Sequence, residues 1–376
     1  MTSHLHVCIV TETYPPEING VAMTVGRLVT GLRGRGHRVD LVRPRQHAGE
    51  QGKGYDLALR GLPLPGYKGL RMGLPAAGVL MARWKKERPQ VVHVVTEGPL
   101  GWSAVSAARR LGIPVTSGFH TNFDSYSTHY GAGWLRPALS AYMRSFHRRT
   151  LATLVPTAAL AATLAGEGVP GVRLVGRGVD TELFNPARRQ QALRQQWRGA
   201  GAGPLCLYVG RLAPEKNLAL AEQAFAAIQA RQPGARMIWV GDGPARARLQ
   251  AAHPEQHFAG PRIGEDLASH YASADLFLFP SLTETYGNVV AEAMASGLAV
   301  LAYRSAAAAD LIKDHANGLT VPPGDAPAFV LAATELAGRD TTDLGKQARV
   351  TALAHGWSGV VERFEDVLRE MGGTAL

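Results

Sequence analysis

The stretch PLCLYVGRLAPEKNLALAEQAFAAIQARQPGARMIWVGDG at residues 204–243 decides the fold. It contains an apolar strand candidate at 204–210, a loop, a helix candidate at 217–231 and a second apolar strand candidate at 235–241. The same alternation continues to residue 303. Strands that alternate with helices predict a parallel sheet covered by helices on both faces, which is a doubly wound, Rossmann-like α/β domain.

The N-terminal part of the chain repeats this pattern. An apolar strand candidate, LHVCIV (5–10), precedes a polar loop, an amphipathic helix (21–32) and a further strand candidate, HRVDLVRP (37–44). The 376 residues exceed what one ordinary core holds, so two Rossmann-like domains are expected.

We place the domain boundary after residue 186, which gives domains at 1–186 and 187–356. The polar, Arg- and Gln-rich stretch at 186–203 is interpreted as an interdomain linker with its own short helix. An amphipathic helix is expected at 357–371, and the segment 357–376 is expected to pack back on the first domain.

Composition indicates a globular protein, with 46% hydrophobic and 19% charged residues. No apolar stretch approaches the roughly 20 residues that span a bilayer, and no cleavable leader is evident. Cys8 and Cys206 each lie in an apolar strand candidate, which favours buried free thiols and a cytoplasmic location. We expect a monomer or a weak dimer.

The net charge of +10 is unevenly distributed. Residues 1–186 carry 22 Lys and Arg against 11 Asp and Glu, whereas residues 187–376 carry 18 against 19. Two interpretations remain open: solubility with a bias towards Arg, or a basic face for an anionic membrane surface or another acidic partner. No recognised nucleic-acid-binding motif accompanies the charge, so no nucleic acid partner is expected.

Three loops carry candidate chemistry, and the first is YPPEINGVA at 14–22. Its prolines restrict the loop, and Gly20 allows a ligand to approach the backbone closely. The helix that follows would present unpaired N–H groups to an anion.

The second loop is GRLAPEKN at 210–217, directly after a strand candidate. It places Arg211 and Lys216 at the carboxyl end of that strand, where open α/β sheets bind ligands. The two cations could neutralise a diphosphate.

The third segment is SLTETYGNVVAEAMASG at 281–297. Glu284 lies in a turn-rich part, and Glu292 lies in the first turns of a helix that begins near Gly287 and Asn288. Carboxylates accept hydrogen bonds from vicinal diols, and the helix start offers N–H groups to phosphate. These residues predict a site for a nucleotide-sugar.

Together, the N-G-V, G-R-L-x-P-E-K-N and E-T-Y-G-N-V-V-A-E-A-M-A-S-G segments resemble the retaining glycosyltransferases of family four over essentially the whole chain. The pieces GFHTN (118–122) and LVGRGVD (174–180) resemble a bacterial branch that glycosylates lipids. That branch includes GDP-mannose-dependent mannosyltransferases and sulfoquinovosyl-diacylglycerol synthases. The resemblance implies a GT-B fold, with two Rossmann-like domains that face a central cleft.

The resemblance also implies roles for single residues. Arg211 and Lys216 would stabilise the diphosphate leaving group, Glu284 would hold the transferred sugar and Glu292 the ribose, while His120 would lie near the reacting centre. Further donor contacts are expected from Asn19, Gly20, Gly210, Val240, Gly241, Arg262, Thr285, Tyr286, Gly287, Asn288 and Val289.

Base recognition is expected from VGDG (240–243) and FAGPRIGE (258–265), although Asp242 could equally cap the following helix. Neither segment distinguishes guanine from uracil. His93, His129 and His147 match no family motif, and we expect them not to be catalytic.

The family resemblance implies transfer of a hexose, with GDP-mannose favoured and a UDP-hexose next, to a lipid or glycolipid at the membrane surface. No Asp-x-Asp motif is evident, so neither a metal nor a cofactor is expected. A soluble or polysaccharide acceptor is an alternative, as is a 2-epimerase or a non-catalytic carbohydrate-binding protein. The segment GWLRPALSAYMRSFHRR (133–149) fits either an amphipathic helix packed on its own domain or a membrane-docking helix.

Overall fold

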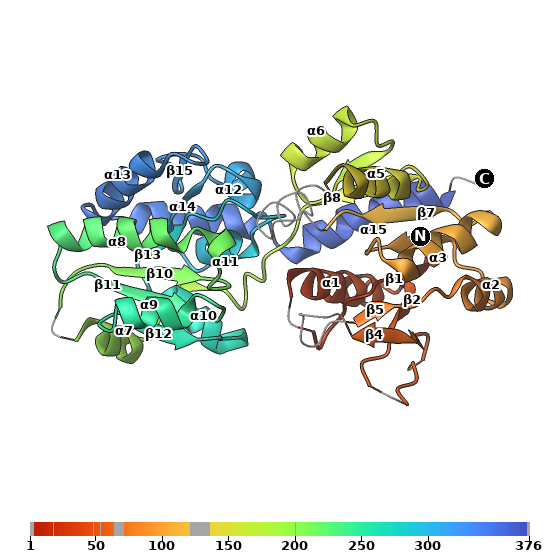
Figure 1. Cartoon of the computed structure of the whole chain (residues 1–376), viewed down its shortest axis with the longest axis horizontal. Helices are drawn as coiled ribbons and strands as arrows, with labels where there is room; N and C mark the ends of the chain where they lie inside the picture. The colour runs from red at the N-terminus through yellow and green to blue at the C-terminus, as the bar shows by residue number, and fades with distance from the viewer. Residues whose placement is uncertain are drawn as a thin grey trace. The chain divides into compact units, whose positions relative to one another are not determined.

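Two parallel sheets, each covered by helices, organise the chain (Figure 1). The structure is a computed structural model that describes residues 4–17, 19–47, 49–52, 54–63, 71–120, 136–199 and 201–373. The chain divides into two compact units. Unit 1 extends to Arg177 and includes the segment from Trp357 onwards, and unit 2 spans Gly178–Gly356.

Unit 1 contains a seven-stranded sheet in the order β3-β2-β1-β6-β7-β8-β9 and a two-stranded antiparallel sheet of β4 and β5. Its strands are β1 (His6–Val10), β2 (Arg38–Pro44), β3 (Leu57–Leu59), β4 (Gly61–Pro63), β5 (Arg71–Gly73), β6 (Val91–Val94), β7 (Val115–Gly118), β8 (Ala152–Val155) and β9 (Val172–Leu174). Its helices are α1 (Gly20–Gly34), α2 (Ala77–Lys86), α3 (Pro99–Arg110), α5 (Arg136–His147), α6 (Ala158–Gly166) and α15 (Trp357–Gly373).

The first strand explains why unit 1 needs helices on both faces of its sheet. Val7 and Ile9 on β1 join the core that contains α1 and α15, whereas Cys8 and Val10 join the core that contains α2 and α3. Successive side chains of a strand point to opposite faces of the sheet, so a strand that is apolar throughout requires helices packed on both faces. Cys8 is a buried free thiol, as predicted, and so is Cys206 in unit 2.

Unit 2 contains a six-stranded sheet in the order β12-β11-β10-β13-β14-β15, and its pairs are parallel. Its strands are β10 (Leu205–Val209), β11 (Arg236–Val240), β12 (His257–Gly260), β13 (Leu276–Phe279), β14 (Ala299–Tyr303) and β15 (Leu319–Val321). Its α-helices are α7 (Gln191–Arg198), α8 (Leu218–Arg231), α9 (Arg246–Ala252), α10 (Gly264–Ser273), α11 (Asn288–Ala295), α12 (Ala306–Leu311), α13 (Ala326–Ala337) and α14 (Thr342–Leu353), and two short 3-10 helices lie at Pro186–Arg188 and Pro214–Lys216.

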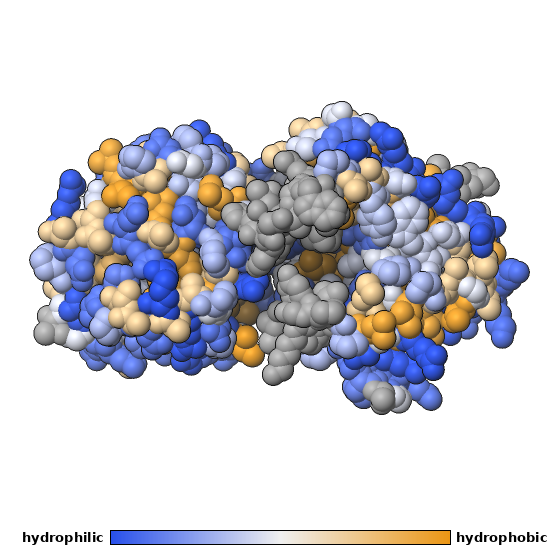
Figure 2. All heavy atoms as spheres, in the orientation of Figure 1, coloured by the Kyte–Doolittle hydropathy of each residue, from blue (hydrophilic) through white to orange (hydrophobic). Residues whose placement is uncertain are grey.

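Figure 1 shows helices on both faces of the unit 2 sheet, with α8 and α13 on one side and α7, α9 and α10 on the other. The prediction of two Rossmann-like α/β domains is confirmed. Both units show a largely hydrophilic visible surface with smaller hydrophobic patches (Figure 2). None of the described helices is both long enough and apolar enough to cross a membrane.

The interpretation of residues 186–203 as a linker is wrong. This stretch lies inside unit 2, whose first residue is Gly178 rather than residue 187. Within it, helix α7 buries Trp197 and Arg194. The Arg194 guanidinium donates to the Asp275 carboxylate at 2.7 and 3.2 Å and to the Ser273 carbonyl at 2.8 Å, which fixes α7 to the unit. This polar stretch can pack on the unit because its arginines pair with the carboxylates of Asp275 and Glu265.

Helix α15 belongs to unit 1 although it ends the chain. Val360, Val361, Phe364, Val367, Leu368 and Met371 are buried in the unit 1 core. Gly31 on α1 makes this packing close, because a Cβ there would lie 2.5 Å from Val361 Cγ2. The sequence of unit 1 is therefore discontinuous.

Candidate active site

The sequence-predicted residues of unit 2 gather where its strand order reverses. From β10 the chain first adds β11 and β12 on one side, and it then crosses over to add β13, β14 and β15 on the other side. Loops that leave the carboxyl ends of β10 and β13 therefore diverge, and this is where open α/β sheets form ligand-binding crevices. Arg211 and Lys216 follow β10, and Glu284 follows β13.

Lys216 and Glu284 form an ion pair at this position. Lys216 Nζ donates to Glu284 Oε1 at 2.5 Å and to the Thr283 carbonyl at 3.3 Å, and both side chains are 16% exposed. Ser281 Oγ donates to the same Glu284 oxygen at 2.8 Å. The pair is thus partly shielded from solvent but still accessible to a ligand. It offers an ammonium group to an anion and a carboxylate to hydroxyl groups.

Arg211 is more exposed than Lys216, with 46% of its side chain accessible. Its Nη1 lies 3.6 Å from Glu215 Oε1, and Glu215 itself is buried. The Arg211 carbonyl accepts a hydrogen bond from the Tyr208 hydroxyl at 3.3 Å, which anchors the start of the loop. The guanidinium keeps donors available for a phosphate.

Glu292 has a different environment from Glu284. It lies on α11 at intermediate exposure, and its Oε2 accepts a hydrogen bond from the Tyr271 hydroxyl at 3.0 Å. Burial raises the pKa of Glu292 to about 7, and the hydrogen bond from Tyr271 opposes this rise. Glu292 therefore exchanges its proton near neutral pH.

Helix α11 begins as the sequence predicted. Gly287 adopts a left-handed conformation with φ 82°, and no side chain of the described residues caps the helix start. The first N–H groups of a helix have no partner within the helix, so those near Asn288 and Val289 are suited to an anion. Tyr286 is buried, and its carbonyl accepts from Ala307 N at 2.7 Å. Thr285 precedes it in the same loop.

The loops expected to contact the base adopt a close-packed backbone. Gly210 N donates to the Val240 carbonyl, and a Cβ on Gly241, whose φ is 135°, would lie 1.9 Å from the Gly210 carbonyl oxygen. Asp242 does not cap α9, because its Oδ1 accepts from Gly243 N and α9 has no side-chain cap. Arg262 donates to the Ala259 carbonyl and to Asp266.

In unit 1, Asn19 closes the helix start that we expected to be open. Its Oδ1 accepts from Val21 N at 3.1 Å and Ala22 N at 2.8 Å, and its Nδ2 donates to Thr13 Oγ1 at 2.7 Å. The expectation of unpaired N–H groups at these two positions is therefore wrong. Gly20, the first residue of α1, is exposed.

His120 follows β7 at the carboxyl edge of the unit 1 sheet. Burial, reinforced by the charge of Arg177, lowers the pKa of His120 well below its ordinary value, so the imidazole is neutral. Its Nδ1 is buried and has no hydrogen-bond partner among the described residues. The ring lies back over the strand end, because a Cβ on Gly118 would be 2.4 Å from its Nε2.

The other histidines of this unit have structural partners. His93 is buried, and its Nδ1 lies 2.9 Å from Thr116 Oγ1. His147 is buried, with its Nδ1 2.9 Å from Ser117 Oγ. His129 lies outside the described residues.

Sequence reasoning missed Glu12, which lies at the strand-order reversal of unit 1, between β1 and β6. Its N–H donates to Thr96 Oγ1 at 3.0 Å, and its Oε1 accepts from Leu100 N at the start of α3 at 3.1 Å. Burial raises the pKa of Glu12 to about 7. Its proximity to Thr96 and α3 depends on strand order, which the local sequence does not reveal.

The described part of segment 133–149 packs on unit 1. Phe146 and Met143 are buried. Arg148 donates to the carbonyls of Glu167 and Gly168, and the Arg149 guanidinium lies 5.0 Å from the centre of the Trp102 ring. These contacts fit an amphipathic helix packed on its own domain, and residues 133–135 lie outside the described residues.

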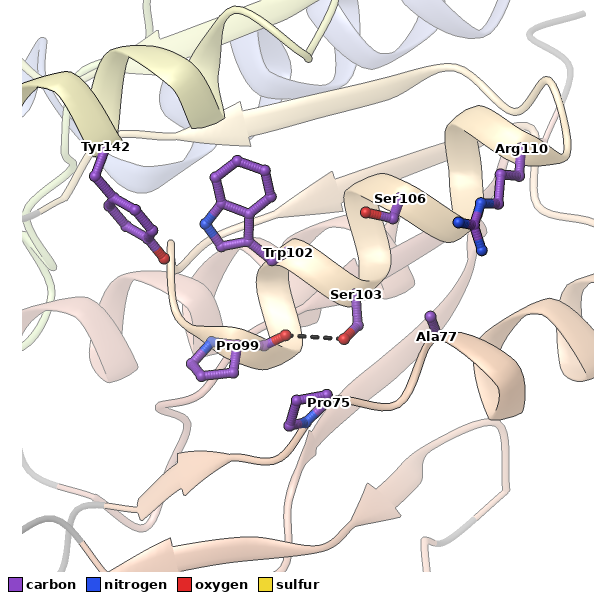
Figure 3. A pocket seen from close by; sticks show the side chains of 8 residues that line it. All are labelled: Pro75, Ala77, Pro99, Trp102, Ser103, Ser106, Arg110 and Tyr142. Carbon is purple, nitrogen blue, oxygen red and sulfur yellow. Dashed lines mark hydrogen bonds between the residues drawn. The ribbon is translucent and has the colours of Figure 1, made fainter.

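A separate hollow of about 520 Å³ lies along α3 (Figure 3). Trp102 and Tyr142 lie at one end and Arg110 at the other, with Pro75 and Ala77 opposite α3 (Figure 3). None of the sequence-predicted site residues lines it.

Comparisons with known proteins agree with this architecture. The family model "Glycosyltransferase Family 4" matches residues 18–183, and "Glycosyl transferases group 1" matches residues 203–339. A GDP-mannose-dependent alpha-mannosyltransferase of Mycobacterium tuberculosis is 36% identical over 85% of this chain and 85% of its own length. An alpha-monoglucosyldiacylglycerol synthase of Streptococcus pneumoniae is 26% identical over 84% of this chain and 74% of its own length.

Among solved structures, a sucrose-phosphate synthase from Thermosynechococcus elongatus superimposes with a TM-score of 0.76 at 19% identity, over 97% of this chain and 99% of the other. At this identity the likeness shows the fold, which is GT-B as predicted. The sequence similarity to the mannosyltransferase extends over most of both chains. The chain therefore belongs to glycosyltransferase family four and is a hexosyltransferase.

Proposed function

We propose that the chain transfers a hexose from a nucleotide-sugar, with GDP-mannose favoured over a UDP-hexose, to a lipid or glycolipid at the membrane surface. The Lys216–Glu284 pair at the strand-order reversal of unit 2 carries the proposal for the donor site. GDP-mannose is favoured because the 36% identical relative is named as dependent on it. The lipid acceptor is supported by the relative whose name includes diacylglycerol.

In this proposal the two cations and the two carboxylates bind different parts of the donor. Arg211 and Lys216 contact the diphosphate, Glu284 accepts hydrogen bonds from hydroxyls of the transferred sugar, and Glu292 accepts them from the ribose. The start of α11, which has no side-chain cap among the described residues, adds backbone N–H groups beside the phosphates. The neutral imidazole of His120 is assigned to the transferred sugar.

During transfer, the bond between the anomeric carbon and the phosphate oxygen breaks, and the diphosphate leaves with the electron pair. The acceptor hydroxyl attacks the face that the diphosphate vacates, and its proton passes to the departing phosphate oxygen, so the configuration is retained. Arg211 and Lys216 stabilise the negative charge that develops on the diphosphate. A fixed cation lowers the barrier because it needs no reorganisation as the charge develops.

The proposal requires neither a metal nor a cofactor, because side-chain cations are assigned the role of charge stabilisation. Among the described residues, no group of three His, Cys, Asp or Glu side chains is placed to hold a metal ion. A transfer rate that falls on chelation and recovers on addition of a divalent cation would contradict this part of the proposal.

A donor screen by thermal shift tests the proposed donor site. GDP-mannose and UDP-glucose are each added to the wild type, to Lys216→Ala and to Lys346→Ala. Lys346 is an exposed lysine on α14, paired with Asp343, and it serves as the matched control. A ligand that binds only the folded state raises the unfolding temperature, so one donor should stabilise the wild type and Lys346→Ala but not Lys216→Ala.

If a donor stabilised all three proteins equally, the assignment of Lys216 to the donor site would be wrong. Donor turnover without acceptor would indicate an epimerase, and sugar binding with no turnover would indicate a carbohydrate-binding protein. Transfer to a soluble sugar or polysaccharide in preference to lipid would retain the donor site and correct the acceptor.

A further inference from the structure

Tyr271 lies on α10, outside every motif that suggested the donor site, yet it contacts a residue of that site. Its side chain is fully buried, and its hydroxyl donates to Glu292 Oε2 at 3.0 Å. Glu292 is on the neighbouring helix α11. The hydrogen bond therefore joins two helices at the carboxylate that we assign to the ribose.

The Tyr271 ring is held on more than one side. Phe184 meets it edge to face with ring centres 5.6 Å apart, and Phe277 lies 5.8 Å away. Phe184 is itself fixed, because Arg349 donates to its carbonyl at 2.7 Å and to the carbonyl of Thr181 at 2.9 Å. A ring packed in this way has little freedom to rotate, so the direction of its hydroxyl is set by the core.

The chemistry of the pair favours one protonation state of each partner. Burial, and the adjacent Glu292 carboxylate, raise the pKa of Tyr271 well above its ordinary value, so the phenol stays protonated and acts as a donor. A donated hydrogen bond stabilises a carboxylate more than a carboxylic acid. A carboxylate has about four acceptor positions, so one bond from Tyr271 leaves capacity for a diol.

We propose that Tyr271 is a positioning residue that favours the ionised form of the Glu292 carboxylate and orients it to accept the two hydroxyls of the donor ribose. This inference rests on the proposed donor site. Tyr271 itself contacts neither the sugar nor the phosphates in this proposal, and it acts through Glu292.

Tyr271 differs from the other titratable groups near α11 because it hydrogen-bonds to Glu292. On the elements packed against α11, the buried titratable groups besides Tyr271 are His270 on α10 and Tyr303 on β14. His270 Nδ1 lies 2.8 Å from the Asp266 carbonyl. Arg349 on α14 also donates to the Ala295 carbonyl at 2.7 Å, in addition to its bonds to the segment before α7. Among these described groups, Tyr271 is the one that hydrogen-bonds to Glu292.

Calorimetric titration with GDP and UDP from pH 6 to pH 9 tests the proposal on wild type, Tyr271→Phe and Glu292→Gln. Phe329→Leu is the stability control, because Phe329 is a buried core residue of α13 and is not assigned to the site. Wild-type affinity should fall as the pH drops below about 7, where Glu292 becomes protonated. In Tyr271→Phe, the pH at which nucleotide affinity falls should be higher by about one unit. Towards pH 9, the affinity of this variant for the nucleotide should approach that of the wild type.

Three further results separate a positioning role from a structural one. Glu292→Gln should bind weakly without the transition, and Phe329→Leu should lower the unfolding temperature while it keeps the wild-type transition. The 2′-deoxy nucleotide lacks one hydroxyl of the diol, so it should bind wild type and Tyr271→Phe alike. In transfer assays at pH 7, Tyr271→Phe should raise the donor KM and leave kcat unchanged.

The inference is overturned if the Tyr271→Phe transition coincides with that of the wild type, if its affinity is reduced equally at every pH, or if the 2′-deoxy nucleotide shows the same shift. These outcomes require a wild type that binds the ribonucleotide. A wild type that binds neither GDP nor UDP would instead refute the proposed donor site.

Discussion

Glu284 and Glu292 show how two glutamates of one motif acquire different properties from their partners. Glu284 accepts from Lys216 and Ser281, and Glu292 accepts from Tyr271. An ammonium beside Glu284 supplies a full positive charge, whereas the phenol beside Glu292 supplies a dipole and leaves burial to dominate its pKa. We therefore assign the two carboxylates different roles in donor binding.

The raised pKa of Glu292 predicts a stability change with pH. Between the ordinary glutamate pKa of about 4.5 and about 7, the folded state binds more protons than the unfolded state. The free energy of unfolding therefore falls as the pH rises through this window. Glu292→Gln removes the cost of ionising the buried group, so it should stabilise the protein by about 3 kcal/mol at pH 8 and by less than about 1 kcal/mol at pH 5.

Urea unfolding at both pH values measures this effect, with Glu182→Gln as the control because Glu182 is exposed in the same unit. A Glu292→Gln variant that is less stable than the wild type at pH 8 would show that the Tyr271 bond outweighs the burial of the carboxylate. The account of Glu292 would then be incorrect.

Single residues were predictable when they belonged to a motif and followed a strand. Lys216 and Glu284 are 68 residues apart in the chain and form an ion pair, because both follow strands that are neighbours in the sheet. Tyr271 and Glu12 were not predictable, since their partners lie 21 and 84–88 residues away on elements whose pairing no local pattern reveals.

At the scale of elements, helix α7 illustrates how a polar sequence can be part of a core. The Asp275 carboxylate accepts from Arg194 and from Leu205 N at 3.0 Å, so it joins α7 to the first strand of unit 2. Burial would raise the pKa of Asp275, but the hydrogen bonds and charge of Arg194 outweigh it and keep the pKa below its ordinary value. The carboxylate thus stays ionised at neutral pH.

Removal of one partner from this largely buried pair should be strongly destabilising. Asp275→Ala leaves the Arg194 charge buried without its carboxylate, which should cost about 3–5 kcal/mol of unfolding free energy. Arg198→Ala is the control, because Arg198 is more exposed and lies 3.5 Å from Asp275, and it should cost less than about 1 kcal/mol. Chemical denaturation of both variants measures the difference, and equal losses would refute the role of the buried pair.

The strands and helices that the sequence located were long or strongly apolar, such as β10, α8 and β11. The sequence predicts a short helix at α7 but places it in a linker, because its hydrophobic content is low. Its partner Asp275 is distant in sequence, so the chain itself offers no sign that the charges are paired. Contacts with residues distant in sequence therefore determine that α7 packs on unit 2.

At the scale of the whole molecule, the excess charge follows the unit boundaries. Unit 1, with its returning C-terminal segment, carries 24 Lys and Arg against 13 Asp and Glu, and unit 2 carries 16 against 17. Arg144 on α5 and Arg148, which follows this helix, use part of this charge in contacts within unit 1. The proposed membrane association therefore rests on the charge of unit 1 more than on one inserted helix.

Vesicle co-sedimentation tests this preference. At low salt, the protein should bind vesicles that contain an anionic phospholipid more strongly than neutral vesicles, and about 0.5 M salt should abolish the difference because it screens charges beyond a few ångströms. Equal binding to both vesicle types would remove the membrane surface from the proposal and would leave the donor site unaffected.

In the proposed function the Lys216–Glu284 site holds the nucleotide-sugar for transfer, and a transfer assay measures this role. Radiolabelled GDP-mannose and UDP-glucose are incubated with a membrane lipid extract and with wild type, Lys216→Ala or Lys346→Ala. The account predicts labelled lipid from one donor, with a rate about 10²–10³-fold lower in Lys216→Ala and unchanged in Lys346→Ala. Lipid labelling by Lys216→Ala at the wild-type rate would contradict it.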